Sequence, residues 1–362
     1  MSGQRILFFA DAPSVHTRRW VAEMVARGHQ CWVVTRQAAE VPGAQEVITL
    51  SPGLDKPGWF KTLPAIRRIT RRLNPDWVHG HYVTGYGLWA AACGARRPTR
   101  VALTAWGSDI LVTPRESRVM RALVGWSLRR VDLITADSQD VLDEIATYGP
   151  TAPRHLILWG ADTDKFVPAA QPPAGFDVVS LRSWEANYNI DVIVEGFAAF
   201  VAQRPLVASV QASRLHLLGG GPDEAALREQ VVRLGLAERV VFHGRVGDAA
   251  MVAALQGSRV SVTIPTSDAT SVSLLESMAC GLPIIASDLP ANRPWVDSAG
   301  GTLIAPRDAA ALARTLLAWA DAPERLAAMG THNRQQIEQR AARRTQMDAM
   351  SALYNAPSRS AA

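Results

Sequence analysis

The sequence is poor in cysteine and contains no long apolar run. Its 362 residues include only three cysteines, Cys31, Cys93 and Cys280. Because they are few, widely spaced and odd in number, they do not suggest a disulfide framework, and we expect a cytoplasmic, reducing location. No stretch of about 18 consecutive apolar residues occurs, and no signal-peptide core follows Met1. The chain therefore predicts neither a transmembrane helix nor export.

Two common binding classes also lack their sequence features. The first predicted strand continues into Ala10-Asp11-Ala12-Pro13, whereas a dinucleotide-binding turn would read Gly-x-Gly-x-x-Gly, so an NAD-dependent oxidoreductase is disfavoured. The net charge of +5 is modest, and the aromatic residues are not interleaved with basic ones in a recognisable nucleic-acid-binding module. We therefore expect no nucleic-acid partner.

What the sequence does contain is the pattern of a globular α/β protein. A hydrophobic content of 48% with 20% charged residues is typical of folded chains, and 362 residues suit two domains. Short apolar strands alternate with helical patterns, as in doubly wound parallel sheets. The pattern restarts after a Pro-rich linker at 166–175, so we expect two Rossmann-like domains with a ligand cleft between them. The expected strands are 5–10, 30–35, 77–81, 100–104, 133–136, 177–181, 215–218, 240–242, 259–263 and 283–286, and the first expected helix is 16–27.

A basic amphipathic pattern lies near residues 59–73. Apolar residues recur there at helical spacing beside basic ones, which is typical of a helix at a membrane surface. An ordinary surface helix whose Arg stems cover apolar neighbours would show the same pattern, and both interpretations stay open. The residues concerned are Trp59, Phe60, Leu63, Ile66, Ile69 and Leu73, with Lys61, Arg67, Arg68, Arg71 and Arg72. The first interpretation predicts peripheral contact with the inner face of a membrane.

The segment from Ser261 to Asp288 carries the clearest functional signal. An apolar strand leads through a loop rich in Ser, Thr and Asp into a short helix beginning near Ser271. The start of such a helix offers unpaired N–H groups and a positive dipole end, which together bind anions. Asp268 lies before the helix and Glu276 within it, so one carboxylate can meet a sugar and the other a ribose. This arrangement predicts a nucleotide-sugar site.

The same segment resembles the signature of a known family. Asp268 is followed by seven residues, by Glu276, and then by Ser277-Met278-Ala279-Cys280-Gly281-Leu282-Pro283. This run resembles the family-four retaining glycosyltransferases, also called glycosyl transferases group 1, and the similarity extends over nearly the whole chain. The resemblance implies the GT-B fold, in which two Rossmann-like domains face each other across a cleft. It also implies an acceptor-binding domain at 1–167, a donor-binding domain at 168–338 and a helix that crosses back at 339–362.

The resemblance further implies a reaction and a set of donor contacts. The reaction is transfer of a sugar, with retention, from a nucleotide diphosphate donor, most often a UDP-sugar, to a glycan, lipid-linked or small-molecule acceptor. The proposed catalytic residues are Asp109, Arg182 and Asp268. Arg182 ends a strand where a cation would stabilise the departing diphosphate, although pairing with Glu185 is the alternative. The predicted donor contacts are Gly220, Gly221, Arg182, His243, Gly244, Val246, Asp268, Thr270, Ser271, Val272, Ser273 and Glu276.

Acceptor-side residues are expected at strand ends in the first half. Asp109 follows a strand, where it can take a proton from an acceptor hydroxyl or cap the next helix, and both interpretations stay open. His79 and His81 alternate on one strand and share a face. With no third ligand nearby, we expect them at a polar strand end facing the cleft and not at a metal site. The acceptor-side set is His16, His81, Trp106, Gly107, Ser108 and Asp109.

No cofactor or metal is expected besides the nucleotide-sugar co-substrate. Asp162-Thr163-Asp164 matches the Asp-x-Asp metal motif of another glycosyltransferase fold. Its surroundings instead resemble the interdomain turn of the GT-B family, where the carboxylates shape the turn. The sequence therefore predicts a metal-independent enzyme.

The chain departs from the family pattern at several points. The usual first Glu is Asp268, a cleft His of the first domain corresponds to Trp106, and the Lys expected after Arg182 is missing from the region 185–189. These changes leave two alternatives open: a GT-B nucleotide-sugar epimerase, and a catalytically silent homologue that only binds a nucleotide sugar. Incubating a donor alone separates the first alternative, because an epimerase isomerises it without an acceptor.

Overall fold

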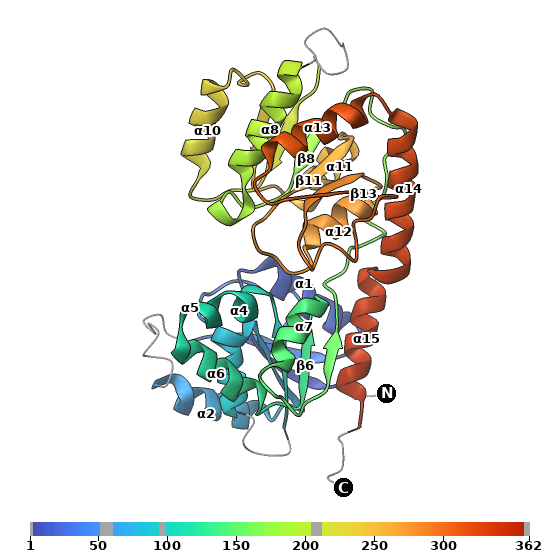
Figure 1. Cartoon of the computed structure of the whole chain (residues 1–362). Coiled ribbons are helices and arrows are strands. Elements are labelled where there is room, and N and C mark those ends of the chain that lie inside the picture. Colours follow the sequence, from blue (N-terminus) through green and yellow to red (C-terminus); the bar gives the residue numbers. More distant parts are fainter. Residues whose placement is uncertain (1–2, 51–60, 94–98, 204–211, 358–362) are drawn as a thin grey trace. The chain divides into compact units, whose positions relative to one another are not determined.

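The computed structural model describes residues 3–50, 61–93, 99–203 and 212–357. The chain forms two compact units (Figure 1). One comprises Met1–Trp159 together with Arg344–Ala362, and the other comprises Gly160–Arg343. The domain limits expected at residues 167 and 338 stay a prediction.

The first unit is built on a seven-stranded sheet in the order β3-β2-β1-β4-β5-β6-β7. Every pair of neighbouring strands is parallel. β1, β4 and β5 consist largely of buried residues, as parallel strands covered on both faces must. The strands are β1 (Arg5–Phe9), β2 (Gln30–Thr35), β3 (Glu46–Thr49), β4 (Trp77–His81), β5 (Arg100–Ala105), β6 (Leu133–Ala136) and β7 (Arg154–Leu156).

Helices lie in most of the connections between the strands of this sheet, as the crossovers of parallel pairing require. The last helix of the chain, from Arg344 onward, belongs to this unit although it lies far from it in sequence. The helices are α1 (Val15–Ala26), α2 (Leu63–Leu73), the π-helix η2 (Tyr82–Tyr86), α3 (Gly87–Cys93), α4 (Ser108–Leu111), α5 (Thr113–Glu116), α6 (Arg118–Leu128), α7 (Gln139–Ala146) and α15 (Arg343–Asn355).

The second unit repeats the architecture with a six-stranded parallel sheet in the order β10-β9-β8-β11-β12-β13. Its strands are β8 (Val178–Ser180), β9 (Leu215–Leu218), β10 (Val240–Gly244), β11 (Val260–Thr263), β12 (Ile284–Ser287) and β13 (Gly301–Ile304). Its helices are the 3-10 helix η3 (Ala186–Tyr188), α8 (Ile190–Gln203), α10 (Glu224–Arg233), α11 (Asp248–Gln256), α12 (Val272–Ala279), α13 (Ala309–Ala320) and α14 (Pro323–Arg340).

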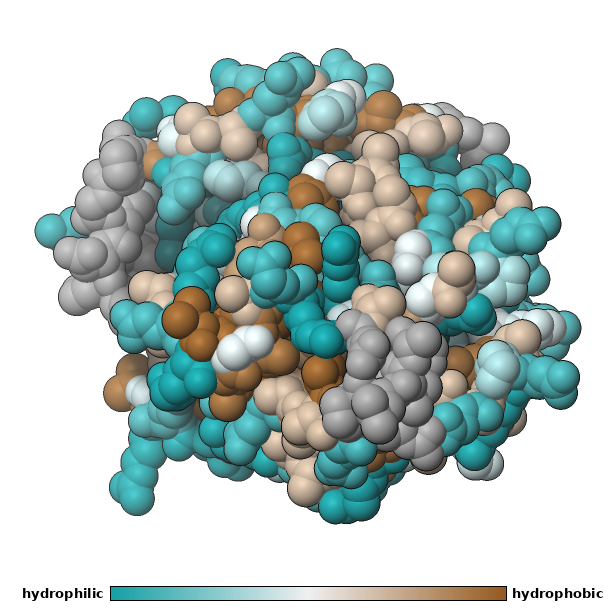
Figure 2. Space-filling model, turned by 90° about the horizontal axis from the view of Figure 1, so that it is seen from above, coloured by the Kyte–Doolittle hydropathy of each residue, from teal (hydrophilic) through white to brown (hydrophobic). Residues whose placement is uncertain are grey.

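A single apolar core holds the second unit together. Phe197 and Phe200 of α8 meet Leu312 and Leu316 of α13, and strand residues such as Val262 complete the cluster. Polar residues cover much of the face shown in Figure 2, with apolar residues among them in small groups. The apolar residues of the strands and helices are thus used to pack each sheet against its own helices.

In both sheets the strand order reverses at one point. In the first sheet, the strand after β1 is added on one side and the strand after β4 on the other. In the second sheet, the same holds for the strands that follow β8 and β11. This confirms the expected pair of Rossmann-like sheets. In such sheets ligands bind where the strand order reverses, beyond the carboxyl ends of the strands. Each unit therefore has one defined edge at which functional residues can gather.

The basic helix predicted near residues 59–73 begins, in the described chain, at Leu63. Ile66 and Leu73 of α2 are buried, whereas its four arginines are exposed: Arg67, Arg68, Arg71 and Arg72. Arg72 pairs with Glu46 across 2.8 Å. The predicted contributions of Trp59 and Phe60 lie outside the described residues. Among the residues that the structure describes, none of the helices has the length and apolar character needed to cross a membrane.

Candidate nucleotide-sugar site

The reversal point of the second sheet is occupied by two loops that the sequence predicted to be functional. Residues 181–189 follow β8, and residues 264–271 follow β11, its neighbour in the sheet. Arg182 comes from the first loop and Asp268 from the second. The carboxyl ends of parallel strands meet at one edge, so residues 86 positions apart in the sequence lie side by side.

Arg182 joins the two loops through its guanidinium group. Nη2 donates a hydrogen bond of 2.7 Å to Oδ2 of Asp268. Nη1 donates to the hydroxyl of Ser271 and, across 3.3 Å, to the hydroxyl of Ser273. The Arg182 side chain is only 9% exposed and that of Asp268 21%, so the pair is largely shielded from water. Arg182 therefore contacts Asp268 and not Glu185, the alternative partner considered from the sequence.

The helix predicted to begin near Ser271 is α12, and Ser271 is its N-cap. The Ser271 hydroxyl accepts a hydrogen bond from the backbone N–H of Leu274, 3.4 Å away. A helix start of this kind presents N–H groups without intrahelical partners, and its dipole adds positive potential. Since Arg182 lies against the same first turn, positive potential gathers there. Such a place suits the two phosphates of a nucleotide diphosphate.

Glu276 lies further along the same helix and is almost fully buried, with 3% of its surface exposed. A cation lies beside it: Nη2 of Arg343 is 3.8 Å from Oε1 of Glu276. A buried carboxylate is costly unless a positive charge or hydrogen-bond donors compensate it. Arg343 supplies that charge here.

The turn that lacks the family lysine has a different use in this chain. Nδ2 of Asn187 donates a hydrogen bond of 2.9 Å to the carbonyl of Ser267, and Oδ1 of Asn187 accepts one of 3.2 Å from the N–H of Ser267. Asn189 donates to the carbonyl of Ile264 over 2.8 Å, and the ring of Tyr188 lies 4.3 Å from the guanidinium carbon of Arg182. The turn thus holds the acidic loop and Arg182 in place by hydrogen bonds and a cation–π contact.

The Gly-rich turn after β9 packs against protein backbone. A β-carbon on Gly219 would lie 2.1 Å from the carbonyl oxygen of Arg182, and one on Gly221 would lie 2.2 Å from that of Trp184. Two of the three glycines are therefore required for the close approach of the two strand-end loops. A β-carbon on Gly220 would instead meet the side chain of Arg245 at 3.3 Å.

His243, expected among the donor contacts, makes a hydrogen bond across the sheet. Its Nε2 lies 2.9 Å from Nδ1 of His216, and Nε2 of His216 lies 3.2 Å from Oδ2 of Asp177. Burial lowers the pKa of His243, and His216 lowers it further. The imidazole is thus part of a polar chain across β8, β9 and β10. Gly244, at the end of β10, accepts a hydrogen bond of 2.9 Å from the N–H of Gly219.

The Asp-x-Asp segment forms a turn. Oδ1 of Asp162 accepts the N–H of Asp164 at 3.3 Å and that of Lys165 at 3.2 Å, as expected for a carboxylate that shapes the chain locally. Within the ranges that the structure describes, no three His, Cys, Asp or Glu side chains form a metal-binding group. Metal independence itself stays a prediction.

In the first unit, the predicted acceptor-side residues gather in an aromatic cluster. His16 at the start of α1 lies 4.8 Å from the ring of Trp159 and 5.6 Å from that of Trp106. His81 lies 5.1 Å from Trp20 and 5.8 Å from Trp106. These residues come from four separate segments that end at the same edge of the sheet. The structure therefore brings His16, His81 and Trp106 together, as the sequence predicted.

His81 is the most deeply buried member of this cluster. It is 1% exposed, and neither ring nitrogen has a hydrogen-bond partner among the described residues. Burial lowers the pKa of His81 to about 3, and the nearby His16 adds to the effect. The ring is therefore uncharged at neutral pH.

Asp109 lies in α4, two residues after the positive-φ residue Gly107, and has no exposed surface. Its Oδ2 accepts the N–H of Val83 at 2.6 Å, and its Oδ1 accepts that of Trp106 at 3.0 Å. Burial raises the pKa of Asp109 to about 6, although these backbone hydrogen bonds lower it. The N-cap interpretation is wrong, because Gly107 is the N-cap of α4.

His79 shares a face with His81, as the alternation predicted, and the two ring centroids lie 4.6 Å apart. It does not lie at a polar strand end, however. The ring is fully buried, with Nε2 at 2.7 Å from the hydroxyl of Thr104 and Nδ1 at the hydroxyl of Tyr354 of α15. The expectation failed because the C-terminal helix covers this part of the sheet.

Two protein-family models match this chain. The model described as "Glycosyl transferase 4-like" matches residues 5–138, and the one described as "Glycosyl transferases group 1" matches residues 177–321. The chain belongs to the group 1 glycosyltransferases. It is a glycosyltransferase that uses nucleotide sugars, and the two matched segments correspond to its two sheets.

Curated relatives resemble the glycosyltransferase over most of its length. The 2-deoxystreptamine N-acetyl-D-glucosaminyltransferase of Streptomyces fradiae is 24% identical, over 83% of this chain and 80% of its own. The lipopolysaccharide core biosynthesis mannosyltransferase LpsB of Rhizobium meliloti is 27% identical, over 86% of this chain and 88% of its own.

Solved structures show that the fold is GT-B. HepE of Anabaena, solved in complex with UDP-glucose, superposes with a TM-score of 0.81 at 15% sequence identity. The match covers 97% of this chain and 99% of that protein. The predicted fold class is thereby confirmed.

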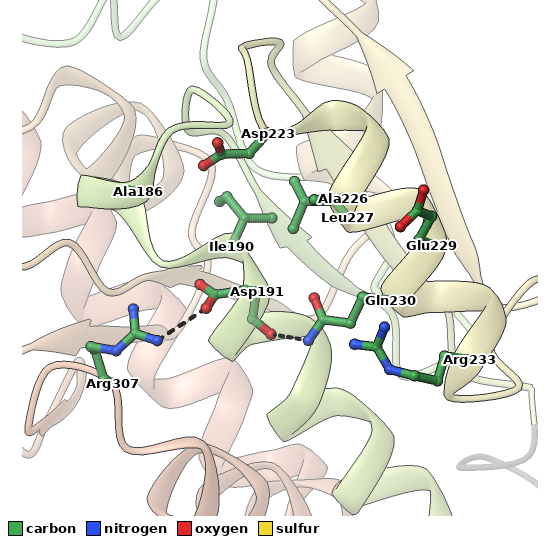
Figure 3. Close-up of a pocket in the computed structure, with 10 residues that line it drawn as sticks. All are labelled: Ala186, Ile190, Asp191, Asp223, Ala226, Leu227, Glu229, Gln230, Arg233 and Arg307. Atoms are coloured by element: carbon green, nitrogen blue, oxygen red, sulfur yellow. Dashed lines mark hydrogen bonds and ion pairs between the residues drawn. The ribbon is translucent and has the colours of Figure 1, made fainter.

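The second unit of the glycosyltransferase also has a groove away from its predicted site. It has a volume of about 430 Å³ and lies between the start of α8, α10 and Arg307 (Figure 3). Arg307 pairs with Asp191 across 3.1 Å and donates to Oδ1 of Asn189 across 2.8 Å. None of the predicted donor contacts lines this groove. Its Arg307 instead supports the turn that holds the acidic loop.

Sequence analysis missed three residues that lie beside the predicted donor site. Tyr188 and Asn189 lie in the turn that lacks the lysine, and Arg245 lies over Gly220. The sequence did indicate the segments in which they lie, since Arg245 stands between two predicted contacts and Tyr188 and Asn189 follow Arg182 within seven residues. Their identities carry no motif, however, and only the folded loops show what they touch.

Replacing His81 by Phe tests whether the buried ring is uncharged in the folded enzyme. The folded-state pKa is about 3, against an ordinary value of 6.5, so the unfolded chain binds a proton first as the pH falls. The free energy of unfolding should therefore fall below pH 6.5. Between pH 7.5 and pH 5 the wild type should lose about 2 kcal/mol more than H81F, measured by urea unfolding with tryptophan fluorescence.

The control is His155→Phe, which removes a histidine from the edge strand β7. This variant should follow the pH dependence of the wild type. If H81F also shows the pH dependence of the wild type, His81 has the same pKa in the folded and the unfolded chain. The neutral ring would then not be the reason why the free energy of unfolding falls at low pH.

Proposed function

We propose that this enzyme transfers a sugar from a UDP-sugar to an acceptor hydroxyl with retention of configuration. The acceptor is a glycan, a lipid-linked sugar or a small molecule. The observation that carries the proposal is the cluster of Arg182, Asp268 and the start of α12 at the reversal point of the second sheet, with Glu276 in the same helix.

The diphosphate is proposed to lie against the first turn of α12. Its oxygens would replace Asp268 and the hydroxyls of Ser271 and Ser273 as partners of Arg182. As the bond to the sugar breaks, negative charge grows on the leaving diphosphate. A guanidinium held beside the first turn of α12 and the helix N-terminus would stabilise that charge.

The two carboxylates are proposed to hold the other parts of the donor. With Arg182 on the phosphates, Asp268 would accept hydrogen bonds from sugar hydroxyls. Glu276, two turns further along the chain and buried, would accept the ribose hydroxyls. Arg245, which lies over Gly220, adds positive charge beside the proposed nucleotide and compensates in part for the missing lysine.

UDP is supported as the nucleotide by HepE, a GT-B protein of the same fold solved with UDP-glucose. The remaining predicted donor contacts, Gly221, Gly244, Val246, Thr270 and Val272, lie in the loops that surround Arg182 and the start of α12. They offer backbone groups at the same edge of the sheet and are proposed to contact the base and the phosphates.

On the acceptor side, the rings of His16, Trp106 and Trp159 are proposed to pack against the apolar face of an acceptor sugar. Gly107 and Ser108 lie in the adjoining loop, where the hydroxyl of Ser108 is 2.9 Å from that of Tyr82. Both oxygens of Asp109 already accept backbone hydrogen bonds. We therefore assign to Asp109 the task of holding this loop, in preference to accepting a proton.

Replacing Glu276 by Ala tests the proposed ribose contact. Hydrogen bonds to a charged group contribute about 1.5–3 kcal/mol each, so UDP affinity measured by calorimetry should fall by about ten- to a hundredfold. Glu229→Ala, which removes an exposed carboxylate of α10, should bind UDP like the wild type. Unchanged affinity of E276A would contradict the assignment, and tighter binding of GDP than of UDP would overturn the choice of nucleotide.

Replacing Arg182 by Ala tests the leaving-group role. Slow hydrolysis of the UDP-sugar by water needs no acceptor, so release of UDP reports the cleavage step. The rate at saturating donor should fall about a hundredfold, more than the affinity does, because the charge on the diphosphate is largest in the transition state. Arg182→Lys should recover part of the rate. An unaltered rate in R182A would remove Arg182 from the mechanism.

The same assay distinguishes the alternative functions. A new nucleotide sugar formed from the donor alone would indicate an epimerase. Tight UDP-sugar binding without release of UDP, and without transfer to acceptors of a cell extract, would indicate a silent binding protein.

We also propose that α2 contacts an anionic membrane surface. Each arginine near such a surface contributes about 1 kcal/mol, so replacing Arg67, Arg68 and Arg71 by Ala should weaken binding to vesicles containing phosphatidylglycerol about a hundredfold. The control R233A/R314A/R325A removes the same charge from exposed positions of the second unit and should bind like the wild type. Equal vesicle binding by both triple variants in cosedimentation would contradict the proposal.

A further inference from the structure

The buried carboxylate of Glu276 has a specific cationic neighbour. Arg343 is itself 8% exposed, and its Nη2 lies 3.8 Å from Oε1 of Glu276. This separation is longer than a hydrogen bond. Arg343 can therefore offset the negative charge of Glu276 without taking up a hydrogen-bonding position on that oxygen.

Arg343 is held in place by backbone contacts on both sides. Its own N–H donates to the carbonyl of Ala161 over 2.8 Å, and its Nη2 donates to that of Gly160 over 3.4 Å. Nη1 lies 3.7 Å from Oδ2 of Asp162. A parallel bridge between Ala161 and Ala342 fixes the same two segments. These backbone contacts hold the Arg343 guanidinium beside Glu276.

Position 160 admits only glycine, because the backbone of Arg343 lies so close to it. Gly160 has a φ of +66°, and a β-carbon there would lie 2.7 Å from the α-carbon of Arg343. Only glycine accommodates both the left-handed backbone and the approach of the second segment. These two segments are also where the chain passes between the two compact units, after Trp159 and after Arg343.

We propose that Arg343 is a positioning residue that keeps the Glu276 carboxylate charged and oriented for the ribose hydroxyls of the donor. The inference rests on the proposed function, in which Glu276 binds the ribose. An ionised carboxylate has acceptor positions on both oxygens, whereas a protonated one has become a donor on one of them. Arg343 therefore acts on nucleotide binding through Glu276 and does not contact the nucleotide itself.

The test is a double-mutant cycle on UDP affinity, measured by calorimetry with wild type, R343Q, E276Q and the double variant E276Q/R343Q. Removing Arg343 alone takes one cation away from a buried carboxylate, so R343Q should bind UDP about tenfold more weakly. Because Arg343 acts through Glu276, the same substitution in the E276Q background should change affinity less than twofold. The double variant removes both charges of the pair, so it serves as the control for a loss of stability in R343Q.

Two further variants separate positioning from general structure. Arg343→Lys keeps the charge and should recover most of the affinity. Arg340→Gln removes a neighbouring arginine that contacts Gln336 and the carbonyl of Pro294, and it should bind UDP like the wild type. Failure of the lysine variant to recover affinity, or equal loss from R343Q in both backgrounds, would overturn the inference.

The outcomes also distinguish this inference from the proposed function. If E276A and E276Q bind UDP like the wild type, the ribose assignment fails and the inference fails with it. If they bind weakly while R343Q binds normally, the ribose assignment stands and only the role of Arg343 is wrong.

Discussion

The ion pair between Arg182 and Asp268 depends on the parallel pairing of β8 and β11. Both strands point the same way, so the loops that follow them leave the sheet at one edge and in opposite directions. The 2.7 Å contact joins these loops. The start of α12, the Asn187–Ser267 contacts and the glycines packed on Arg182 and Trp184 are all arranged around that junction. Without the parallel register, none of these groups would meet.

The two edges of the enzyme differ in the chemistry that they offer. In the second unit, charged and hydroxyl groups surround a helix N-terminus, which suits an anionic donor. In the first unit, Trp106, Trp159 and His81 form an aromatic cluster. Burial in this cluster lowers the pKa of His81, so its ring is uncharged at neutral pH. The two edges therefore differ in polarity, in the sense that the proposed donor and acceptor roles require.

Much of the fold could be predicted from the sequence because it depends on local patterns. The strands at 30–35, 77–81, 133–136 and 215–218 were predicted with the bounds that the structure shows. β3, β7 and β13 were missed, since they are short and partly exposed, and edge strands carry little apolar signal. Asp268 and Glu276 were predicted from a motif, and Arg182 and Ser271 from a strand end and a helix start. Tyr188 and Asn189 carry no motif, and Arg343 was missed because its contact with Glu276 joins segments far apart in sequence.

The sequence by itself determined the fold class and the family, because apolar alternation and a spaced pair of carboxylates are properties of short stretches of chain. Only the tertiary structure decided which partner each charge has. It paired Arg182 with Asp268, buried Asp109 under backbone N–H groups and covered His79 with the C-terminal helix. Electrostatic partners are chosen by distance in space, and distance in space is set by strand order and helix packing, which no local stretch of sequence contains.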